Sequence, residues 1–214
     1  MTREDLIGLY RLLARSLAYP DEDYLKLVQE AVGKVRMELW DDPRLPLSAL
    51  IEELGHLAWL PLEQLQGEHT RLFIAAYPRV PCPPYESVYT EGVLRGEAAE
   101  EVDGLYRQWG VVVEGEEVDH AGAELEFAAF LLALDTHDSI AAAEDLLTCH
   151  LRAWLPRFAV DLTRESRIRL YQVVGELLAA VLDESFNAGE GPARVGPERV
   201  TLSNQQSVPA ERLP

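Results

Sequence analysis

Apolar residues recur every three or four positions along most of this 214-residue chain. That spacing collects the apolar side chains on one face of an α-helix, whereas a half-buried strand would alternate apolar and polar residues. The chain is therefore predicted to be an all-α protein. The first stretch of the pattern begins after Thr2, a candidate N-cap, stops at Pro20, and has the stripe Leu6, Leu9, Tyr10, Leu13 and Leu17.

The same periodicity predicts further helices, which end at proline, glycine or aspartate. The stretch 118–134 is apolar on nearly every side, so we expect it at the centre of the molecule. The last residues, 188–214, are rich in glycine, proline and polar groups and poor in large apolar ones, so burial cannot offset their ordering entropy. We expect a single-domain bundle of about seven or eight helices over 1–187 and a flexible or disordered tail over 188–214. The later helices are expected near 21–39, 48–59, 61–73, 94–109, 118–134, 139–158 and 166–186.

A proline-rich stretch, YPRVPCPPYESVY at 77–89, interrupts the helical pattern. Its four prolines remove backbone donors and fix the backbone, so it is predicted to form neither a helix nor a central strand. One interpretation is a stiff connector whose tyrosines pack on the bundle. The other is a rim on which a peptide docks, because a stiff segment loses little entropy on binding. The residues alone leave both interpretations open.

The charge balance of the chain limits the classes of binding partner, and its lack of targeting signals limits the cellular compartments in which it is expected. The 37 acidic residues outnumber the 19 basic ones, giving a formal net charge of -18, which repels nucleic acid and anionic lipid. The excess is equally well explained by attraction of a basic partner or by solubility. No apolar run approaches the roughly 18 residues of a membrane span, and the chain opens with charged residues, unlike a signal peptide. With only two cysteines, we expect a cytoplasmic protein without stable membrane association.

Sequence motifs for catalysis are missing: there is no GxSxG, P-loop, GxGxxG or HExxH. One metal-like pattern remains, a pair of Glu-x-x-His spacings such as those that build di-iron sites in helical bundles. It offers a di-metal oxidoreductase as an alternative function. In so acidic a chain, however, such spacings are expected by chance. The candidate ligands of this alternative are Glu53, His56, Glu117 and His120, with Glu68 and Glu124 completing the set.

Three blocks of sequence resemble a known family, the cytoplasmic TorD/DmsD/NarJ chaperones of molybdenum-containing redox enzymes. EHTRLF at 68–73 looks like the family's E-[YHW]-x-R-L-F helix, and PPYESVY at 83–89 looks like its PP[YW]xSVY segment. EEVDH at 116–120, followed by ELEF at 124–127, resembles its E-x-x-D-H and E-L-x-F helix start. The runs AYPRVPCPPYESVYTEG and HAGAELEF look most like the branch that serves type II dimethyl sulfoxide reductase-like enzymes.

The resemblance implies an all-helical, non-catalytic chaperone without a metal or cofactor of its own, as a monomer or a dimer. Its implied partner is the apo catalytic subunit of a molybdopterin oxidoreductase together with its N-terminal, twin-arginine type signal peptide. A structural subunit of a redox complex is a further alternative. In this interpretation apolar side chains hold the hydrophobic part of the signal, and acidic ones pair with its arginines. The implied peptide-binding residues are His69, Leu72, Phe73, Pro84, Tyr85, Ser87, Glu116, Asp119, His120 and Glu124.

Overall fold

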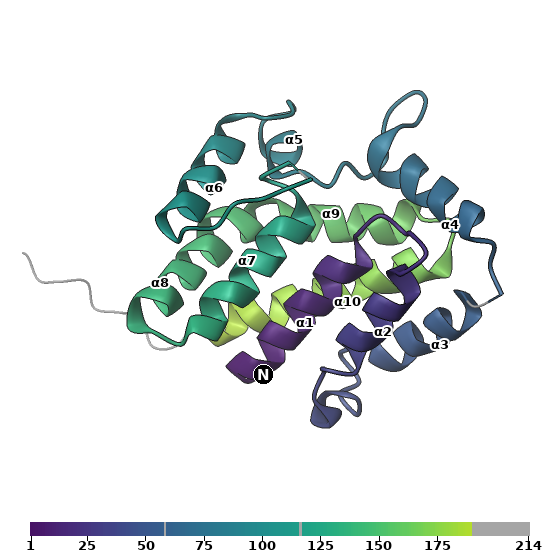
Figure 1. The fold of residues 1–214 in the computed structure, drawn as a ribbon, viewed down its shortest axis with the longest axis horizontal. Coiled ribbons are helices and arrows are strands. Elements are labelled where there is room, and N and C mark those ends of the chain that lie inside the picture. The colour runs from purple at the N-terminus through teal and green to yellow at the C-terminus, as the bar shows by residue number, and fades with distance from the viewer. Residues whose placement is uncertain (58, 116, 190–214) are drawn as a thin grey trace, which may run out of the picture.

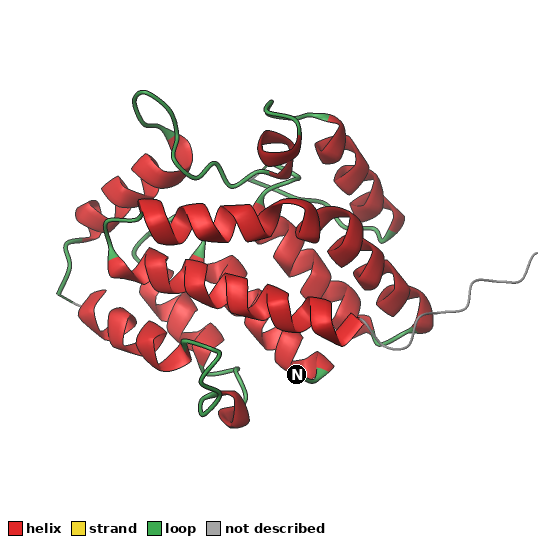
Figure 2. Cartoon of the chain, turned by 180° about the vertical axis from the view of Figure 1, so that it is seen from behind, coloured by secondary structure: helices red, strands yellow, loops and turns green. Residues whose placement is uncertain are grey.

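The structure is a computed structural model that describes residues 1–57, 59–115 and 117–189, with side chains up to Asp183. Every regular element in these ranges is helical, and the one β-type pairing there is an isolated antiparallel bridge between Tyr85 and His120 (Figure 2). The predicted all-α class is therefore confirmed. The elements are α1 (Arg3–Ser16), α2 (Tyr24–Val32), η1 (Met37–Leu39), α3 (Leu47–Leu57), α4 (Leu62–His69), η2 (Thr70–Ile74), α5 (Glu86–Thr90), α6 (Glu97–Gln108), α7 (Ala121–Leu134), α8 (His137–Leu146), η3 (Leu147–Leu151), α9 (Arg152–Glu165) and α10 (Arg169–Gly189).

The helices form one bundle whose centre contains α1, α7, α9 and α10. Figure 1 shows α1 between α7 and α2, with the long α10 behind it, and α1 contacts all three. The helix α9 packs along α10, while α5 and α6 lie at the end of the molecule opposite α2 and α3. None of the helices in the described ranges combines the length and apolarity needed to span a bilayer.

Helix α1 forms as its sequence predicts. The Thr2 hydroxyl accepts a hydrogen bond from the Asp5 amide at 3.3 Å, and the Asp5 carboxylate accepts one from the Thr2 amide at 2.7 Å. This capping box satisfies two amide groups that a helix start would otherwise leave without partners. The predicted stripe faces inward: Leu9, Tyr10 and Leu13 are fully buried.

Helix α7 occupies the predicted central position. It packs against α1 and α8, and Leu125 and Ala128 are completely buried among apolar neighbours. A helix that is apolar on every side needs partners all round, and the bundle supplies them. It ends at Asp135, which has a left-handed backbone with φ of 54°.

The second predicted helix is shorter than its apolar stripe suggested. Helix α2 ends at Val32, Gly33 follows, and the chain becomes helical again only at η1. The amides of Lys34 and Val35 bond three residues back rather than four, which tightens and ends the helix at this glycine. Val35 is nevertheless buried, so the stripe predicted burial correctly and helix length wrongly.

The prediction that no helix forms within 77–89 is wrong at its end, where α5 begins at Glu86. All four prolines precede Tyr85, so the residues from Glu86 onward have their amide donors. The amide of Ser87 is bound by a carboxylate from another part of the chain, as described below. The remainder of the stretch, 77–84, contains no helix, as expected.

Helices α8 and α9 form one continuous run interrupted by η3, a five-residue π-helical segment. A second π-helical segment, η2, extends α4 in the same way. Such segments often mark functional positions because the extra residue changes which side chains face inward. The predicted tail over 188–214 lies outside the described residues except for its first two, which belong to α10.

Candidate functional site

Two of the three motif blocks meet at the start of α7. The amide of Glu86 donates to the carbonyl of Asp119 at 3.0 Å, and the amide of Ala121 donates to the carbonyl of Pro84 at 2.9 Å. These bonds flank the bridge between Tyr85 and His120. The proline-rich stretch and the Asp-His helix start, more than 30 residues apart, are therefore held together by their backbones.

Asp119 is a buried anchor in this structure. Its side chain has no exposed surface, and its Oδ2 accepts hydrogen bonds from the Ser87 amide at 2.9 Å and the Ser87 hydroxyl at 2.6 Å. Its Oδ1 has no hydrogen-bond partner among the described residues. Asp119 therefore fixes the start of α5, and in this conformation solvent does not reach its carboxylate.

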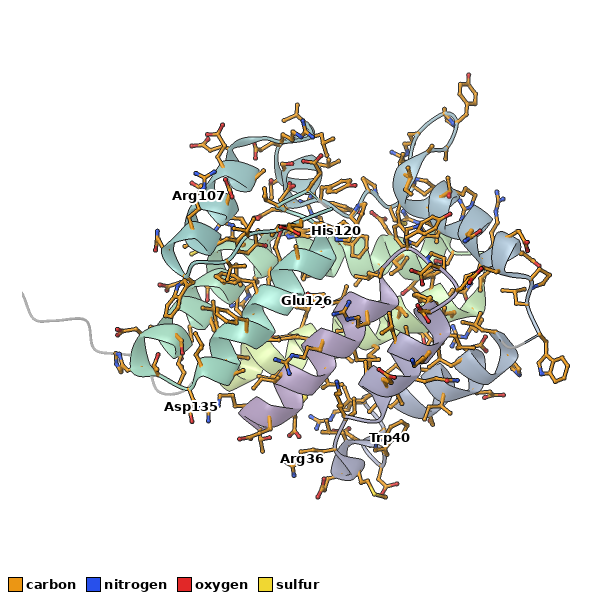
Figure 3. All side chains as sticks on the ribbon, viewed as in Figure 1. Arg36, Trp40, Arg107, His120, Glu126 and Asp135 are labelled. Atoms are coloured by element: carbon orange, nitrogen blue, oxygen red, sulfur yellow. The ribbon has the colours of Figure 1, made fainter. Side chains whose placement is uncertain are left out.

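His120 is the N-cap of α7. Its Nδ1 accepts a hydrogen bond from the Gly122 amide at 3.0 Å, which requires the neutral tautomer with the proton on Nε2. Burial, and to a smaller extent the nearby His69, lower the pKa of His120 to about 4, while Asp119 acts in the opposite direction. The imidazole is consequently neutral at pH 7. Figure 3 shows it at the end of α7 nearest α5.

A buried polar cluster lies under α5, and we define it as Glu86, Ser87, Asp119, Glu124, His150 and Trp154. The Glu86 carboxylate and the His150 Nδ1 are 3.0 Å apart, and the Trp154 indole N–H donates to Glu124 at 3.3 Å. Burial, and then the charges of Glu86 and Asp119, raise the pKa of Glu124 well above its usual value. This environment favours the neutral, protonated form of Glu124.

The first motif block contributes core residues. Leu72 is fully buried, and its carbonyl accepts a hydrogen bond from the Cys82 amide at 2.9 Å. The His69 ring meets Phe73 edge to face at a centroid distance of 4.7 Å, and its Nε2 lies 3.3 Å from the Leu17 carbonyl. Burial lowers the pKa of His69. This block therefore attaches the irregular segment that follows η2, residues 75–84, to the bundle.

A largely apolar groove runs between α5 and the segment that consists of the end of η2 and the irregular residues after it. Its volume is about 620 Å³. Stiff proline backbone and aromatic rings form its walls, so it requires little reorganisation to receive an apolar chain. The groove is defined by Phe73, Ile74, Arg79, Val80, Pro81, Pro83, Tyr85, Val88, Tyr89, Leu94, Asp161 and Arg164.

The predicted peptide-binding residues that the structure describes separate into three groups. Phe73 and Tyr85 line the groove. His120 lines a second hollow of about 440 Å³ between α1, α6 and α7. Glu116 lies outside the described residues. The others are His69, Leu72, Pro84, Ser87, Asp119 and Glu124, which are buried beneath these surfaces.

Glu86 and His150 were missed by the sequence analysis. The two residues are 64 positions apart, and nothing in the local pattern connects them. The one available signal was the helical geometry at 149–150, which indicates that one of these neighbours is buried and the other exposed. The structure buries His150 and exposes Cys149.

The ligands of the di-metal alternative are not gathered in one place. His56 is mostly exposed and lies 3.6 Å from Glu53 in α3, whereas Glu117 forms an ion pair with Arg95. Within the described ranges no three His, Cys, Asp or Glu side chains are placed to share a metal ion. The geometry therefore gives this alternative no support.

Comparison with known proteins places this fold among maturation proteins. The family model of the nitrate reductase delta subunit matches residues 41–160. The Tat proofreading chaperone DmsD of Salmonella typhi is 34% identical over 192 residues, 85% of this chain and 89% of that protein. A crystal structure described as a redox enzyme maturation protein from Archaeoglobus fulgidus has 30% identity and a TM-score of 0.61, covering 86% of this chain and 94% of the other.

A shorter match is found with the chaperone protein TorD of Vibrio cholerae serotype O1. It is 32% identical over 113 residues, which are 47% of this chain and 51% of TorD. The chain thus spans about half the length of the TorD relatives it matches. The matched family model covers more than half of the chain, and the match to DmsD extends over most of both proteins. The chain therefore belongs to the family of the nitrate reductase delta subunit and the TorD and DmsD chaperones.

Proposed function

We propose that this protein is a cytoplasmic, non-catalytic maturation chaperone. It binds the twin-arginine type leader, or the apo form, of a molybdopterin oxidoreductase subunit during cofactor insertion. The observation that carries the proposal is the convergence of motif blocks on the groove, since Phe73 comes from the first block and Tyr85 from the second. The relative named a Tat proofreading chaperone supports the same function.

The chemistry of the groove suits the hydrophobic part of a leader. Ile74 and Leu94 expose about half of their surface, 56% and 52%, so a bound apolar segment would remove this surface from water. Asp161 and Arg164 stand among the apolar residues and supply polar contacts. The net charge of -18 attracts a leader whose head is basic.

The test is a titration of a fluorescently labelled leader peptide, taken from a molybdoenzyme encoded beside this protein, with the purified protein. Binding is monitored by the fluorescence anisotropy of the peptide. Ile74→Asp places a charge in the groove at an exposed position, so binding should weaken at least about tenfold, roughly 1.4 kcal/mol, while the fold is retained. Met37→Asp is the matched control, because Met37 is 83% exposed and outside the groove. Equal affinity for both variants would move the docking site elsewhere.

Purification of the mature redox complex distinguishes a chaperone from a structural subunit. A chaperone should be absent from the mature complex, whereas a structural subunit would co-purify with it. The finer assignment to a client of the type II dimethyl sulfoxide reductase-like branch rests on the motif runs, and titration with leaders from different branches tests it. Preferential binding of a leader from another branch would remove that assignment.

A further inference from the structure

Helix α5 forms the wall of the groove but is too short to hold its own position. It spans five residues, Glu86–Thr90, and an isolated helix of that length is unstable in water. Val88 and Tyr89 face the groove, while Glu86 and Ser87 are buried on the other side. The orientation of this wall is therefore set by whatever its buried side contacts.

Two side chains from distant parts of the chain make those contacts. Asp119 binds the Ser87 amide and hydroxyl, which fixes the first turn. His150 reaches the Glu86 carboxylate from η3, and it is itself only 7% exposed. Both His150 and its neighbour Cys149 lie in the π-helical segment, where His150 is buried and Cys149 is exposed.

His150 supplies the hydrogen-bond partner of the Glu86 carboxylate within this buried polar cluster. Glu86 lies near Asp119 and Glu124, both completely buried carboxyl groups. A buried carboxylate without a partner is strongly unfavourable, so Glu86 depends on this hydrogen bond. Removing the imidazole would leave Glu86 with no partner for its charge, and α5 would shift to bring the carboxylate toward water.

From this arrangement we infer that His150 and Glu86 are positioning residues for partner binding: their buried pair holds α5, and with it the Val88–Tyr89 wall of the groove. Neither residue lines the groove, so each acts on a bound partner only through α5. The predicted effect on leader binding rests on the proposed function. The effect of the His150–Glu86 pair on the position of α5 can be measured without any partner.

Trp154 reports the position of α5 directly. Its ring lies 5.5 Å from that of Tyr89, and its indole N–H donates to Glu124 within the cluster. A displaced α5 should therefore shift the ¹H–¹⁵N signal of this indole, which the Trp154→Phe variant assigns. Destabilisation of the fold elsewhere would lower the unfolding midpoint without moving this signal at a temperature where the protein is folded.

The experiment compares His150→Ala, His150→Gln and Cys149→Ala by the indole signal, by leader titration and by urea unfolding. His150→Ala should shift the indole signal and weaken leader binding at least tenfold. Gln keeps an N–H donor for Glu86, so His150→Gln should restore affinity to within about threefold of the wild type. Cys149→Ala, on the exposed side of the same segment, should match the wild type in all three measurements.

Two outcomes would overturn the inference. One is a folded His150→Ala protein with an unmoved indole signal. The other is a His150→Gln protein that binds no better than His150→Ala. If the wild type itself binds no leader, the proposed function fails, and the indole signal of His150→Ala alone then decides the inference.

Discussion

Truncation of Asp119 should be costly, and the cost can be worked from its two hydrogen bonds. In Asp119→Ala the Ser87 amide and hydroxyl both lose their acceptor in a fully buried site. The hydroxyl can rotate toward another acceptor, but the amide cannot. A buried donor left without a partner costs about 1–3 kcal/mol, so the two losses together should lower the free energy of unfolding by about 3 kcal/mol. For a chain of this size that lowers Tm by about 6–12 °C.

Asp119→Asn is the informative comparison. The amide side chain keeps an oxygen acceptor for both Ser87 donors and removes a charge that faces Glu124. It should therefore cost less than about 1 kcal/mol. Ser87→Ala removes only the hydroxyl donor and should cost about 1 kcal/mol.

The assay is urea unfolding followed by far-UV circular dichroism at pH 7.5, with the slope of the transition as a check on two-state behaviour. The anchor interpretation is refuted if Asp119→Ala unfolds within 1 kcal/mol of the wild type, or if Asp119→Asn is equally destabilised. A direct contact between Asp119 and a leader arginine makes a different prediction. It requires Asp119→Asn to lose affinity for the leader while retaining its stability.

Three further predictions concern backbone packing and pH. Gly175→Ala should lower the free energy of unfolding by about 1–3 kcal/mol, because the added Cβ would lie 2.5 Å from Thr163 Oγ1 and 2.8 Å from a carbonyl oxygen of α9. Gly104→Ala has open space around it and should be neutral or stabilise α6 by up to about 1 kcal/mol, so thermal unfolding of the two variants compares these effects. The pKa of His120 in the folded protein lies below its value in the unfolded chain, so the unfolded chain takes up the proton first as pH falls. The free energy of unfolding should therefore fall by about 2–4 kcal/mol between pH 6.5 and about 4. His120→Asn keeps a cap acceptor, and its free energy of unfolding, measured by urea titration across this range, should lack this decrease. The pKa of Glu124 is raised in the folded protein, so the stability that this group contributes is lost as pH rises. Glu124→Gln should therefore become more stable than the wild type as pH increases from 5 to 8. A difference in stability that does not change with pH would contradict a buried neutral acid at this position.

Most of the fold follows from local patterns, and the exceptions have local causes. The eight predicted helices correspond to α1–α4, α6, α7, the α8–α9 run and α10. Periodicity could not locate the end of α2, because the apolar stripe continues past Gly33, where the amides bond three residues back and the backbone becomes extended at Arg36. It also missed α5, whose first turn depends on Asp119, a residue 32 positions from Ser87.

The site was only partly predictable, because sequence resemblance identifies residues without giving their exposure. Phe73 and Tyr85 line the groove, but Asp119 is enclosed by Ser87 and lies where no partner arginine can reach it in this conformation. The capping role of His120 could not be predicted, since histidine is not among the common N-cap residues and its tautomer depends on burial. Peptide binding by these residues remains a prediction.

The π-helical segment η3 has a consequence for any attempt to recombine this protein with its relatives. Its extra residue acts as a phase shift between the two halves of one long helix, so that α8 presents its apolar side to α7 and α9 presents its own to α10. Deleting one residue from Leu147–Leu151 would return the run to a single phase and rotate Trp154 and Phe158 by about 100° away from Tyr89, whose ring both contact. Crossover points for chimaeras should therefore fall outside this segment, with its five residues kept together.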